Sequence, residues 1–238
     1  MKTIMLITVF SLSLFSCAQE TVKGNGNFET EIRNVSKNFD AVGSSGAFEV
    51  IINDAPQDGK IKLEGDANIL KKINVEVKGN SLILETKKGF NLSFKKPIKI
   101  TLNAQNLRSL ALSGSGSILA KGTQNVEEFS VAVSGSGNID SKVSSHKVST
   151  AISGSGDITL AGKANFLSVG TSGSGDVYAF KLNVKDAEIG VSGSGDTELT
   201  VSGTLTGAIS GSGDIKYKGN PVNIKVQSAG SGDIIDAN

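Results

Sequence analysis

A short glycine–serine motif occurs seven times in the second half of the chain at nearly constant spacing. Six copies read SGSG and the last reads AGSG, and they begin at residues 113, 134, 153, 172, 192, 210 and 229. A period of about 19–20 residues is typical of a solenoid, in which each repeat forms one coil that stacks on the next. Gly-Ser-Gly disfavours helix, and β-branched residues alternate with polar ones between the motifs. Each coil is therefore expected to contain two short strands joined by two turns.

Alignment of the copies shows columns of apolar residues on both sides of the motif. Side chains two positions apart in a strand point to the same face, so columns with this spacing are expected to form one inward face. The position before the motif holds Leu112, Val133, Ile152, Thr171, Val191, Ile209 and Ser228. The second position after it holds Ile118, Ile139, Ile158, Val177, Thr197 and Ile215. The core is predicted to be a stack of aliphatic ladders, one of which is interrupted at Thr197.

The motif is absent before residue 113, but strand-like apolar runs continue from residue 28 onwards. AFEVIIN, KIKLEG, INVEVKG, SLILET and PIKITLNA read as strands with turn residues between them. DANILKKI at 66–73 predicts one helical turn or a bent connection. A bare terminal coil would expose a strand edge and its core. We therefore expect residues 28–112 to form longer, degenerate coils that begin the solenoid and cap it, and residues 113–238 to form the regular β-helix.

The N-terminus has the layout of a bacterial export signal. A lysine is followed by an apolar run from Ile4 to Phe15 and then by the only cysteine of the chain, Cys17. The run is too short to span a bilayer as a mature helix. LFSC at 14–17 is similar to the lipobox of bacterial lipoproteins, whose cysteine is acylated, although Phe15 replaces the small residue usual there.

These features assign residues 1–17 to a lipoprotein-type signal peptide and lipobox, with lipidation at Cys17, and residues 18–27 to a short tether. A lone unpaired thiol is unusual in an exported protein, which favours lipidation. An ordinary signal peptide that ends near a cysteine is the alternative.

Several stretches of the chain carry a resemblance to a known family. They are FDAVGSSGAFEVII at 39–52, GNSLILET, PIKITL and the serial SGSGDI run, which together cover nearly all of the mature chain. They resemble the bacterial exported proteins described as "putative auto-transporter adhesin, head GIN domain", found mainly in Bacteroidetes. The resemblance implies an all-β fold, a right-handed parallel β-helix with GSG at the tight turns. It also implies a role in adhesion without a conserved catalytic site.

Charge and motif context argue against several classes of function. Without Lys2 the chain has 23 basic and 23 acidic residues, so no overall charge excess attracts it to nucleic acid or anionic lipid. A phosphate-binding loop leads into a helix, whereas GSGD leads into a strand and places a carboxylate where a phosphate needs a cation. A serine hydrolase needs a base beside one serine, but the only histidine, His146, reads as an exposed turn residue. No cofactor, metal ion or nucleic acid is expected.

An aspartate follows the motif in five copies, at Asp157, Asp176, Asp196, Asp214 and Asp233. β-Helical polysaccharide lyases and glycosidases use acidic or basic residues of neighbouring coils, but this uniform column marks no single coil as catalytic. Calcium binding is a second alternative, because carboxylates and carbonyls are calcium ligands. The favoured interpretation is that each aspartate accepts hydrogen bonds from turn backbone N–H groups, since Asn138, with the same acceptor geometry, replaces aspartate in the second copy.

The outward positions of the strand before each motif carry small side chains. They read Ser-x-Ala or Ser-x-Gly in the first four coils, which predicts a flat, weakly polar face, whereas the opposite sheet is rough and charged. A flat face suits close contact with a second subunit or another surface, and reduced crowding in the stacked sheet is the alternative explanation. The candidate interaction face consists of Ser130, Ala132, Ser149, Ala151, Ser168, Gly170, Gly190 and Ala208.

These expectations combine into one functional hypothesis. The chain is expected to be a non-catalytic cell-envelope lipoprotein, lipid-anchored in the outer membrane, that presents a β-helical surface for adhesion or protein–protein interaction. Its partner would be a protein, a surface or a second copy of the chain, with membrane contact through the lipid anchor alone. The alternatives are a polysaccharide-active β-helix enzyme and a purely structural envelope component.

Overall fold

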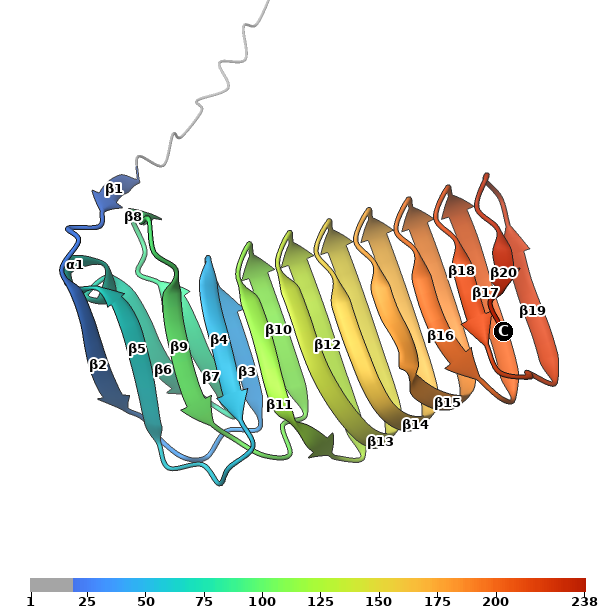
Figure 1. Ribbon diagram of the computed structural model, residues 1–238, viewed down its shortest axis with the longest axis horizontal. Helices are drawn as coiled ribbons and strands as arrows, with labels where there is room; N and C mark the ends of the chain where they lie inside the picture. Colours follow the sequence, from blue (N-terminus) through green and yellow to red (C-terminus); the bar gives the residue numbers. More distant parts are fainter. Residues whose placement is uncertain (1–18) are drawn as a thin grey trace, which may run out of the picture.

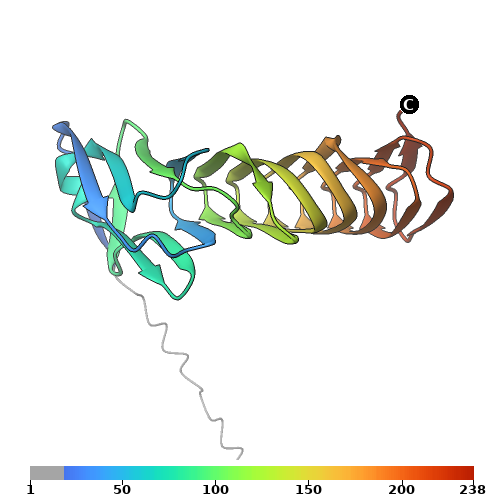
Figure 2. The same cartoon turned by 90° about the horizontal axis from the view of Figure 1, so that it is seen from below.

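The molecule is elongated and consists almost entirely of β-strands. The structure is a computed structural model that describes residues 19–238. From residue 109 onwards the strands wind into a stack of parallel coils (Figures 1 and 2). They are β10 (Ser109–Gly114), β11 (Ser117–Asn125), β12 (Glu128–Gly135), β13 (Asn138–Gly154), β14 (Ile158–Gly173), β15 (Val177–Gly193), β16 (Thr197–Val201), β17 (Thr204–Gly211), β18 (Ile215–Lys218), β19 (Asn223–Ser228) and β20 (Ile234–Asp236). The predicted all-β parallel solenoid with GSG at the tight turns is thereby confirmed.

Each coil has two arms, which lie in two layers and meet at two corners. The motif forms a tight corner, called here the GSG corner, directly after β10, β12, β13, β14, β15 and β17. At the opposite corner, the wide corner, β13, β14 and β15 stay extended while the chain turns, so each of these strands contributes to both layers. In these three coils only one of the two expected turns is therefore a tight turn, and the other is a bend within a strand, whereas a short break separates β11 from β12, β16 from β17 and β18 from β19.

The core between the layers consists of the predicted aliphatic ladders. Parallel pairing places two columns in continuous register, and their members are almost completely buried. Removal of apolar surface from water is the main stabilising contribution of such a stack. One ladder is Ile118, Ile139, Ile158, Val177, Thr197 and Ile215, and the other is Leu112, Val133, Ile152, Thr171, Val191 and Ile209.

Backbone contacts between stacked GSG corners explain the first glycine of the motif. At Gly173 φ is +124°, a conformation that residues with a side chain rarely adopt. A Cβ on Gly173 would also overlap the carbonyl oxygen of Gly154 in the preceding coil. That oxygen accepts a hydrogen bond of 2.8 Å from the N–H of Ser174, and the equivalent bond joins the neighbouring corners along the stack. Glycine thus lets successive corners approach closely enough to hydrogen-bond.

Residues 28–112 combine parallel coils with antiparallel strands. β3 (Ala41–Ser45) and β7 (Ser81–Thr86) continue the layer of β10, while β4 (Phe48–Asn53) and β9 (Ile98–Asn103) continue the layer of β11, all in parallel. The antiparallel pairs are β2 with β5, β5 with β9, and β6 with β7. These strands are β2 (Phe28–Asn34), β5 (Lys60–Asp66) and β6 (Ile73–Lys78), and the predicted helical turn is α1 (Ala67–Leu70). Buried residues of β5, α1 and β6 extend the core to this end of the stack.

The two ends of the molecule differ (Figure 1). At the N-terminal end, β1 (Glu20–Lys23) pairs in parallel with β8 (Phe90–Ser93) as a separate two-stranded sheet, so part of the stretch expected to be a tether is a strand. At the C-terminal end, Val222 is 79% exposed and Ile224 is 45% exposed, and no strand of the described chain covers them. Cys17 and the rest of the predicted signal peptide lie outside the described residues.

Candidate binding face

The eight residues predicted as an interaction face lie together on the outer surface of one layer. They are called here the small-residue face. Parallel pairing aligns one row across successive coils, which consists of Ala132, Ala151, Gly170, Gly190 and Ala208. A second row in the same register, two residues earlier in each strand, consists of Ser130, Ser149 and Ser168. All eight are at least partly exposed.

Crowding between stacked strands does not explain the small residues of this face. A Cβ added at Gly170 would have its nearest non-neighbouring atom at 3.9 Å, and one at Gly190 at 3.8 Å, which are ordinary van der Waals distances. The row of Ser168 also continues as Glu188 and Thr206 in the next two coils, so larger side chains fit on the same layer. The flatness is therefore a property of the surface and not a requirement of the core.

The rows extend beyond the eight predicted residues. Ala111 and Gly43 pair in register before Ala132, so the strip from Gly43 to Ala208 is about 29 Å long at about 4.8 Å per strand. The first serines of the motifs form a further row on its other side, which consists of Ser113, Ser134, Ser153, Ser172, Ser192 and Ser210. Their position two residues after the alanines was a sequence signal for this row. Gly43 lies outside the repeat and had no such signal.

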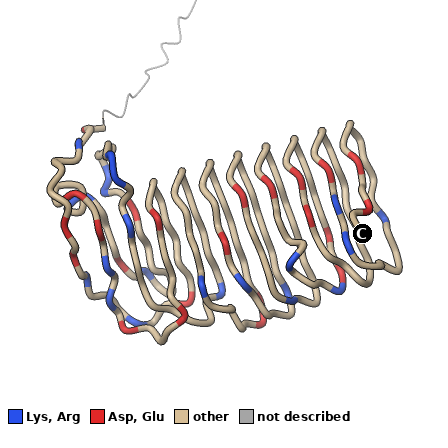
Figure 3. The backbone as a smooth tube through the Cα atoms, viewed as in Figure 1, with Lys and Arg blue, Asp and Glu red and all other residues tan. Residues whose placement is uncertain are grey.

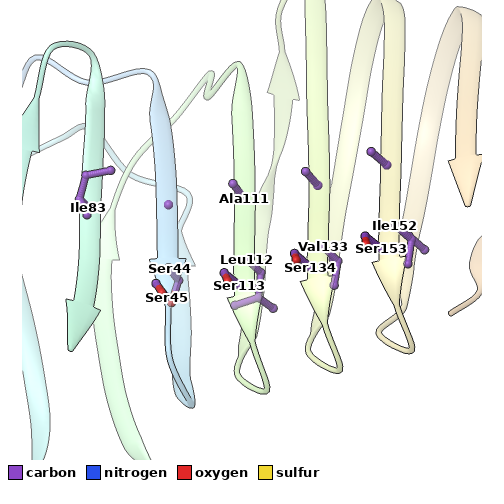
Figure 4. Close-up of a pocket in the computed structure, with 13 residues that line it drawn as sticks. Ser44, Ser45, Ile83, Ala111, Leu112, Ser113, Val133, Ser134, Ile152 and Ser153 are labelled. Carbon is purple, nitrogen blue, oxygen red and sulfur yellow. The ribbon is translucent and has the colours of Figure 1, made fainter. Parts of the chain in front are cut away.

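Two shallow hollows follow one another along this strip. The first has a volume of about 450 Å³ (Figure 4), and its lining includes Gly43, Ile83, Ala111, Ala132 and Ala151. The second has a volume of about 410 Å³, and its lining includes Gly170, Gly190 and Ala208. Backbone, aliphatic groups and hydroxyls line both hollows, and no charged side chain does. The strip therefore offers an uncharged surface against which another surface can pack without desolvating an ion.

The aspartates of the motif form a hydrogen-bonded ladder at the GSG corner. Oδ1 of Asp157 accepts a hydrogen bond of 3.0 Å from the N–H of Asp176, whose own Oδ1 accepts one of 2.7 Å from Asp196. The ladder begins at Asn138 and continues through Asp214 to Asp233. Acidic residues accordingly recur near this corner in successive coils (Figure 3). The predicted role of these side chains as acceptors for backbone N–H groups is confirmed for Asp157, Asp176, Asp196 and Asp214, but the donor lies in the corner of the next coil and not in the residue's own turn.

Asp196 and Asp176 each have a second hydrogen-bond partner, which lies on the layer opposite the small-residue face. Lys216 Nζ donates to Asp196 Oδ2 at 2.7 Å, and the Tyr178 hydroxyl donates to Asp176 Oδ2 at 2.9 Å. Desolvation raises the pKa of Asp196, but the hydrogen bonds from Lys216 and from the backbone of Asp214, with the charge of Lys216, bring it below its usual value. The hydrogen bond to Asp176, followed by desolvation and nearby carboxylates, raises the pKa of Tyr178 to about 12. At neutral pH Asp196 is therefore ionised and Tyr178 protonated.

The residues considered in the sequence analysis for a serine hydrolase or a metal site do not come together in the described part of the chain. His146 lies at the wide corner, at the other end of the strand arms from the motif serines, and its Nδ1 is 3.0 Å from the amide nitrogen of Asn165. No hydrogen bond joins its ring to a serine within the described part of the chain. Among residues 19–238, no group of three or more His, Cys, Asp or Glu side chains is placed to hold a metal ion.

A family model described as "Putative auto-transporter adhesin, head GIN domain" matches residues 38–221, which include the small-residue face and most of the GSG coils. The chain belongs to this family. The head GIN domain thus comprises both the coils with the motif and the preceding strands from β3 to β9. The family resemblance inferred from the sequence is confirmed.

Solved structures share the fold of this head GIN chain. A putative adhesin from Bacteroides fragilis NCTC 9343 has a TM-score of 0.83 and 25% identity, over 90% of this chain and 98% of that one. A putative lipid binding protein from Parabacteroides distasonis ATCC 8503 has a TM-score of 0.74 and 23% identity, over 91% of this chain and 100% of that one. A putative adhesin from Parabacteroides merdae ATCC 43184 has a TM-score of 0.68 and 20% identity, over 91% and 99%. The search of curated proteins found no match.

None of the helices between residues 19 and 238 has the length and apolar character needed to cross a bilayer.

Proposed function

We propose that this protein is a non-catalytic adhesin of the cell envelope and that its small-residue face binds the partner. The observation that carries the proposal is the strip from Gly43 to Ala208, where alanine or glycine recurs in register although a Cβ has room at Gly170 and Gly190 and larger side chains occur in the adjacent row. Contact with such a strip requires no ion to be desolvated. Membership of an adhesin-like family supports this class of function.

The size of the strip limits what it contributes to an interface. Between its two serine rows it is about 13 Å wide and about 29 Å long, which is about 400 Å². A standard protein interface buries about 800 Å² on each partner. The partner therefore has to reach beyond the strip, onto the flanking serines and the residues next to them. We propose that this partner is a protein or a cell surface, and a second copy of the chain is the alternative.

The hydrogen bonding of the acidic residues supports the absence of catalysis. A general acid or base works best with a pKa near the operating pH and a free site for the proton. The aspartates instead hold backbone N–H groups of the next coil, and Asp196 is also paired with Lys216. These contacts favour a structural role for the column over the alternative of a polysaccharide-active enzyme.

The N-terminal sequence supports anchoring of the protein by lipid. We infer that Cys17 is acylated after export and that the anchor lies in the outer membrane, because the cysteine ends a signal-like segment and has no second cysteine to pair with. The proposed arrangement is an anchored N-terminus with the coils presented beyond it.

The test places two long, charged side chains in the middle of the strip. Ala151→Arg with Gly170→Arg would hold a flat partner away, while both side chains point into solvent in the free monomer. The matched control is Asn165→Arg with Asn183→Arg, which adds the same charge at two exposed positions near the wide corner. The experiment uses sedimentation for self-association, and cross-linked capture from envelope extract for other partners, with thermal melting to check folding.

We expect both double variants to melt like the unmodified chain and only the strip variant to lose association. Association retained by the strip variant would contradict the proposal and direct attention to the charged opposite layer. Loss of association in both double variants would show a general effect of added charge and would also contradict the proposal that the small-residue face binds the partner.

Lipid binding is a second candidate function for the same face. The hollow of about 450 Å³ beside Ile83 is lined by aliphatic groups and hydroxyls, and a solved structure of the same fold is that of a putative lipid binding protein. Fluorescent fatty acid binding that Ala132→Arg abolishes would favour this function over adhesion. No binding of the fatty acid to the unmodified chain would reject it.

A further inference from the structure

Seven lysines surround the small β1–β8 sheet at the capped end of the molecule. They lie at the end of β1, before and after β8, and directly after α1, and we call them the β1–β8 lysines: Lys23, Lys71, Lys72, Lys87, Lys88, Lys95 and Lys96. Six of them are exposed and Lys72 is half-buried. The segments are joined by backbone, since the N–H of Lys87 donates to the carbonyl of Lys72 at 2.8 Å. None of the seven takes part in an ion pair within the described chain.

Aromatic rings lie beside two of these ammonium groups. Lys72 Nζ is 3.7 Å from the ring centre of Phe90, and Lys96 Nζ is 5.2 Å from that of Phe28, which is 46% exposed. A hollow of about 470 Å³ next to them is lined by Lys23, Lys95 and Lys96, among others. Lysines beside an exposed phenylalanine are a combination found on surfaces that lie at the headgroup level of a bilayer.

Few carboxylates neutralise this patch. Glu20 and Asp66 lie on the same segments, and Glu31 on the neighbouring β2 is already paired with Arg33 at 3.0 Å. From residue 86 to residue 99 the chain has five lysines and no acidic residue. Glu31 also interacts with Lys71 and Lys87, but the seven lysines outnumber these carboxylates, so the patch carries a net positive charge.

The balanced charge of the whole chain conceals a separation along its length. Residues 20–112 carry 14 basic and 11 acidic residues, whereas residues 113–238 carry 9 basic and 12 acidic residues. Basic residues accordingly gather near β1 and β8, while acidic residues follow the GSG corners (Figure 3). The capped end is attracted to an anionic surface, and the coils are repelled from it.

The chain enters the fold in the middle of the basic patch. The N–H of Glu20 donates to the carbonyl of Gly89 at 2.8 Å, directly after Lys87 and Lys88. Cys17 precedes Glu20 by three residues, which span at most about 11 Å when fully extended. The Debye length at physiological ionic strength is about 8 Å. A lipid on Cys17 would thus hold the start of β1 within about one and a half Debye lengths of the headgroups.

We propose that the β1–β8 lysines dock on anionic phospholipid headgroups and hold the capped end against the bilayer. The inference extends the proposed lipid anchor by a second contact, and the two together give firmer attachment than an acyl chain alone. Docking at this end directs the acidic coils, and with them the small-residue face, away from the membrane. It replaces the expectation that the membrane is contacted through the anchor only.

The test uses the chain 18–238, which contains every strand and helix of the fold but no lipid. Its binding is measured by co-sedimentation with phosphatidylcholine vesicles that contain about 30% phosphatidylglycerol or none. The test variant reverses four of the lysines, by Lys87→Glu, Lys88→Glu, Lys95→Glu and Lys96→Glu. The matched control reverses four exposed lysines of the coils, by Lys147→Glu, Lys163→Glu, Lys181→Glu and Lys185→Glu, so that both variants have the same net charge.

We expect the unmodified chain to bind only the anionic vesicles and to be released by about 0.5 M salt. One lysine near an anionic surface strengthens binding about fivefold, so the test variant should bind about a hundredfold more weakly or worse, while the control binds within about threefold of the unmodified chain. Thermal melting followed by circular dichroism checks that both variants are folded.

Three outcomes would overturn the inference. They are equal binding to both kinds of vesicle, equal losses in the two variants, and equally tight binding to heparin, which would indicate a general polyanion site. Because the test chain carries no lipid and an intact small-residue face, these outcomes leave the proposed anchor and the proposed adhesion untouched.

Discussion

Two threonines stand in the aliphatic ladders with hydroxyl groups that have no partner. Thr197 is 0% exposed and Thr171 is 3% exposed, and neither Oγ1 forms a hydrogen bond within the described residues. A buried hydroxyl without a partner costs about 1–3 kcal/mol of stability. Thr197 lies between Val177 and Ile215 in its ladder, so its surroundings suit a methyl group better than a hydroxyl.

Thr197→Val is expected to stabilise the fold by about 1 kcal/mol, because valine keeps the shape and removes the unpaired hydroxyl. The measurement is the free energy of unfolding from urea titration. Thr200→Val on the same strand is the control, since Oγ1 of Thr200 donates to the carbonyl of Phe180 at 2.8 Å and its loss should bring no gain. A lower stability of Thr197→Val would show that the hydroxyl has a partner, such as a buried water molecule.

For each residue of the coils, the sequence could predict whether its side chain points into the core or outward. The alternation of apolar with small or polar residues in each copy identified the ladder residues and the outward alanines, because side-chain direction in a strand follows from local spacing alone. The missing partner of Thr197 could not be predicted in this way. Hydrogen-bond partners depend on which atoms of the neighbouring coils lie within reach.

The GSG corner is the element that fixes the distance between coils. Each corner donates a hydrogen bond to the carbonyl of the first glycine in the preceding corner, and the aspartate ladder adds a second row of bonds beside it. Both rows run along the stack. A corner that moves outward therefore weakens its contacts with two neighbours at once.

Gly173→Ala is expected to destabilise the fold by about 2–5 kcal/mol, because the new Cβ combines an unfavourable φ with overlap of the Gly154 carbonyl. Gly170→Ala, three residues earlier in the same strand, is the control and should change stability by less than about 1 kcal/mol, since its Cβ has room. Chemical denaturation compares the two variants. Equal effects would refute the account of the corner.

The pairing of the coil strands could be predicted from the sequence, whereas most cap strands were recognised but their antiparallel pairing was not. A repeat places each coil beside its neighbours in the sequence alignment, so the parallel register follows from the period. β2 pairs with β5, about 30 residues later, and β6 pairs with β7 across a short turn. No periodicity specifies such pairings, which depend on which apolar faces meet in three dimensions.

At the scale of the whole molecule, the N-terminal attachment determines which surfaces are presented. β1 begins three residues after Cys17, and its partner β8 belongs to the capped end. An anchor at Cys17 therefore leaves the GSG coils as the distal part of the protein (Figure 1). The length of the stack then sets how far the small-residue face reaches from the membrane.

Cys17→Ser is expected to move the protein from the detergent-extracted membrane fraction to the soluble fraction, because the acyl acceptor is lost. Immunoblots of fractions washed with about 0.5 M salt measure the change, since salt weakens any electrostatic attachment that remains. Ser16→Ala is the control and should stay in the membrane fraction. Membrane association of Cys17→Ser after the salt wash would argue against lipidation.

The candidate face could be predicted in part, and the lysine patch could not. The outward positions of the coils repeat with the motif, so eight residues of the face follow from the sequence alone. The β1–β8 lysines are spread over segments from residue 23 to residue 96. Only the folding of β1 and α1 against β8 brings them to one end, and the neutral total charge gave no indication of it.

The direction of the hydrogen bonds between coils has a mechanical consequence. Parallel pairing joins each coil to the next along the length of the stack, and the last coil is covered by nothing in the described chain. Tension applied to the chain between an anchored N-terminus and the far end would therefore detach the last coil first, because only one neighbouring coil holds it. Each coil of about 20 residues that unwinds replaces about 4.8 Å of stack by about 65 Å of extended chain. Under a pull, such a molecule lengthens stepwise and absorbs the force while its attachment holds.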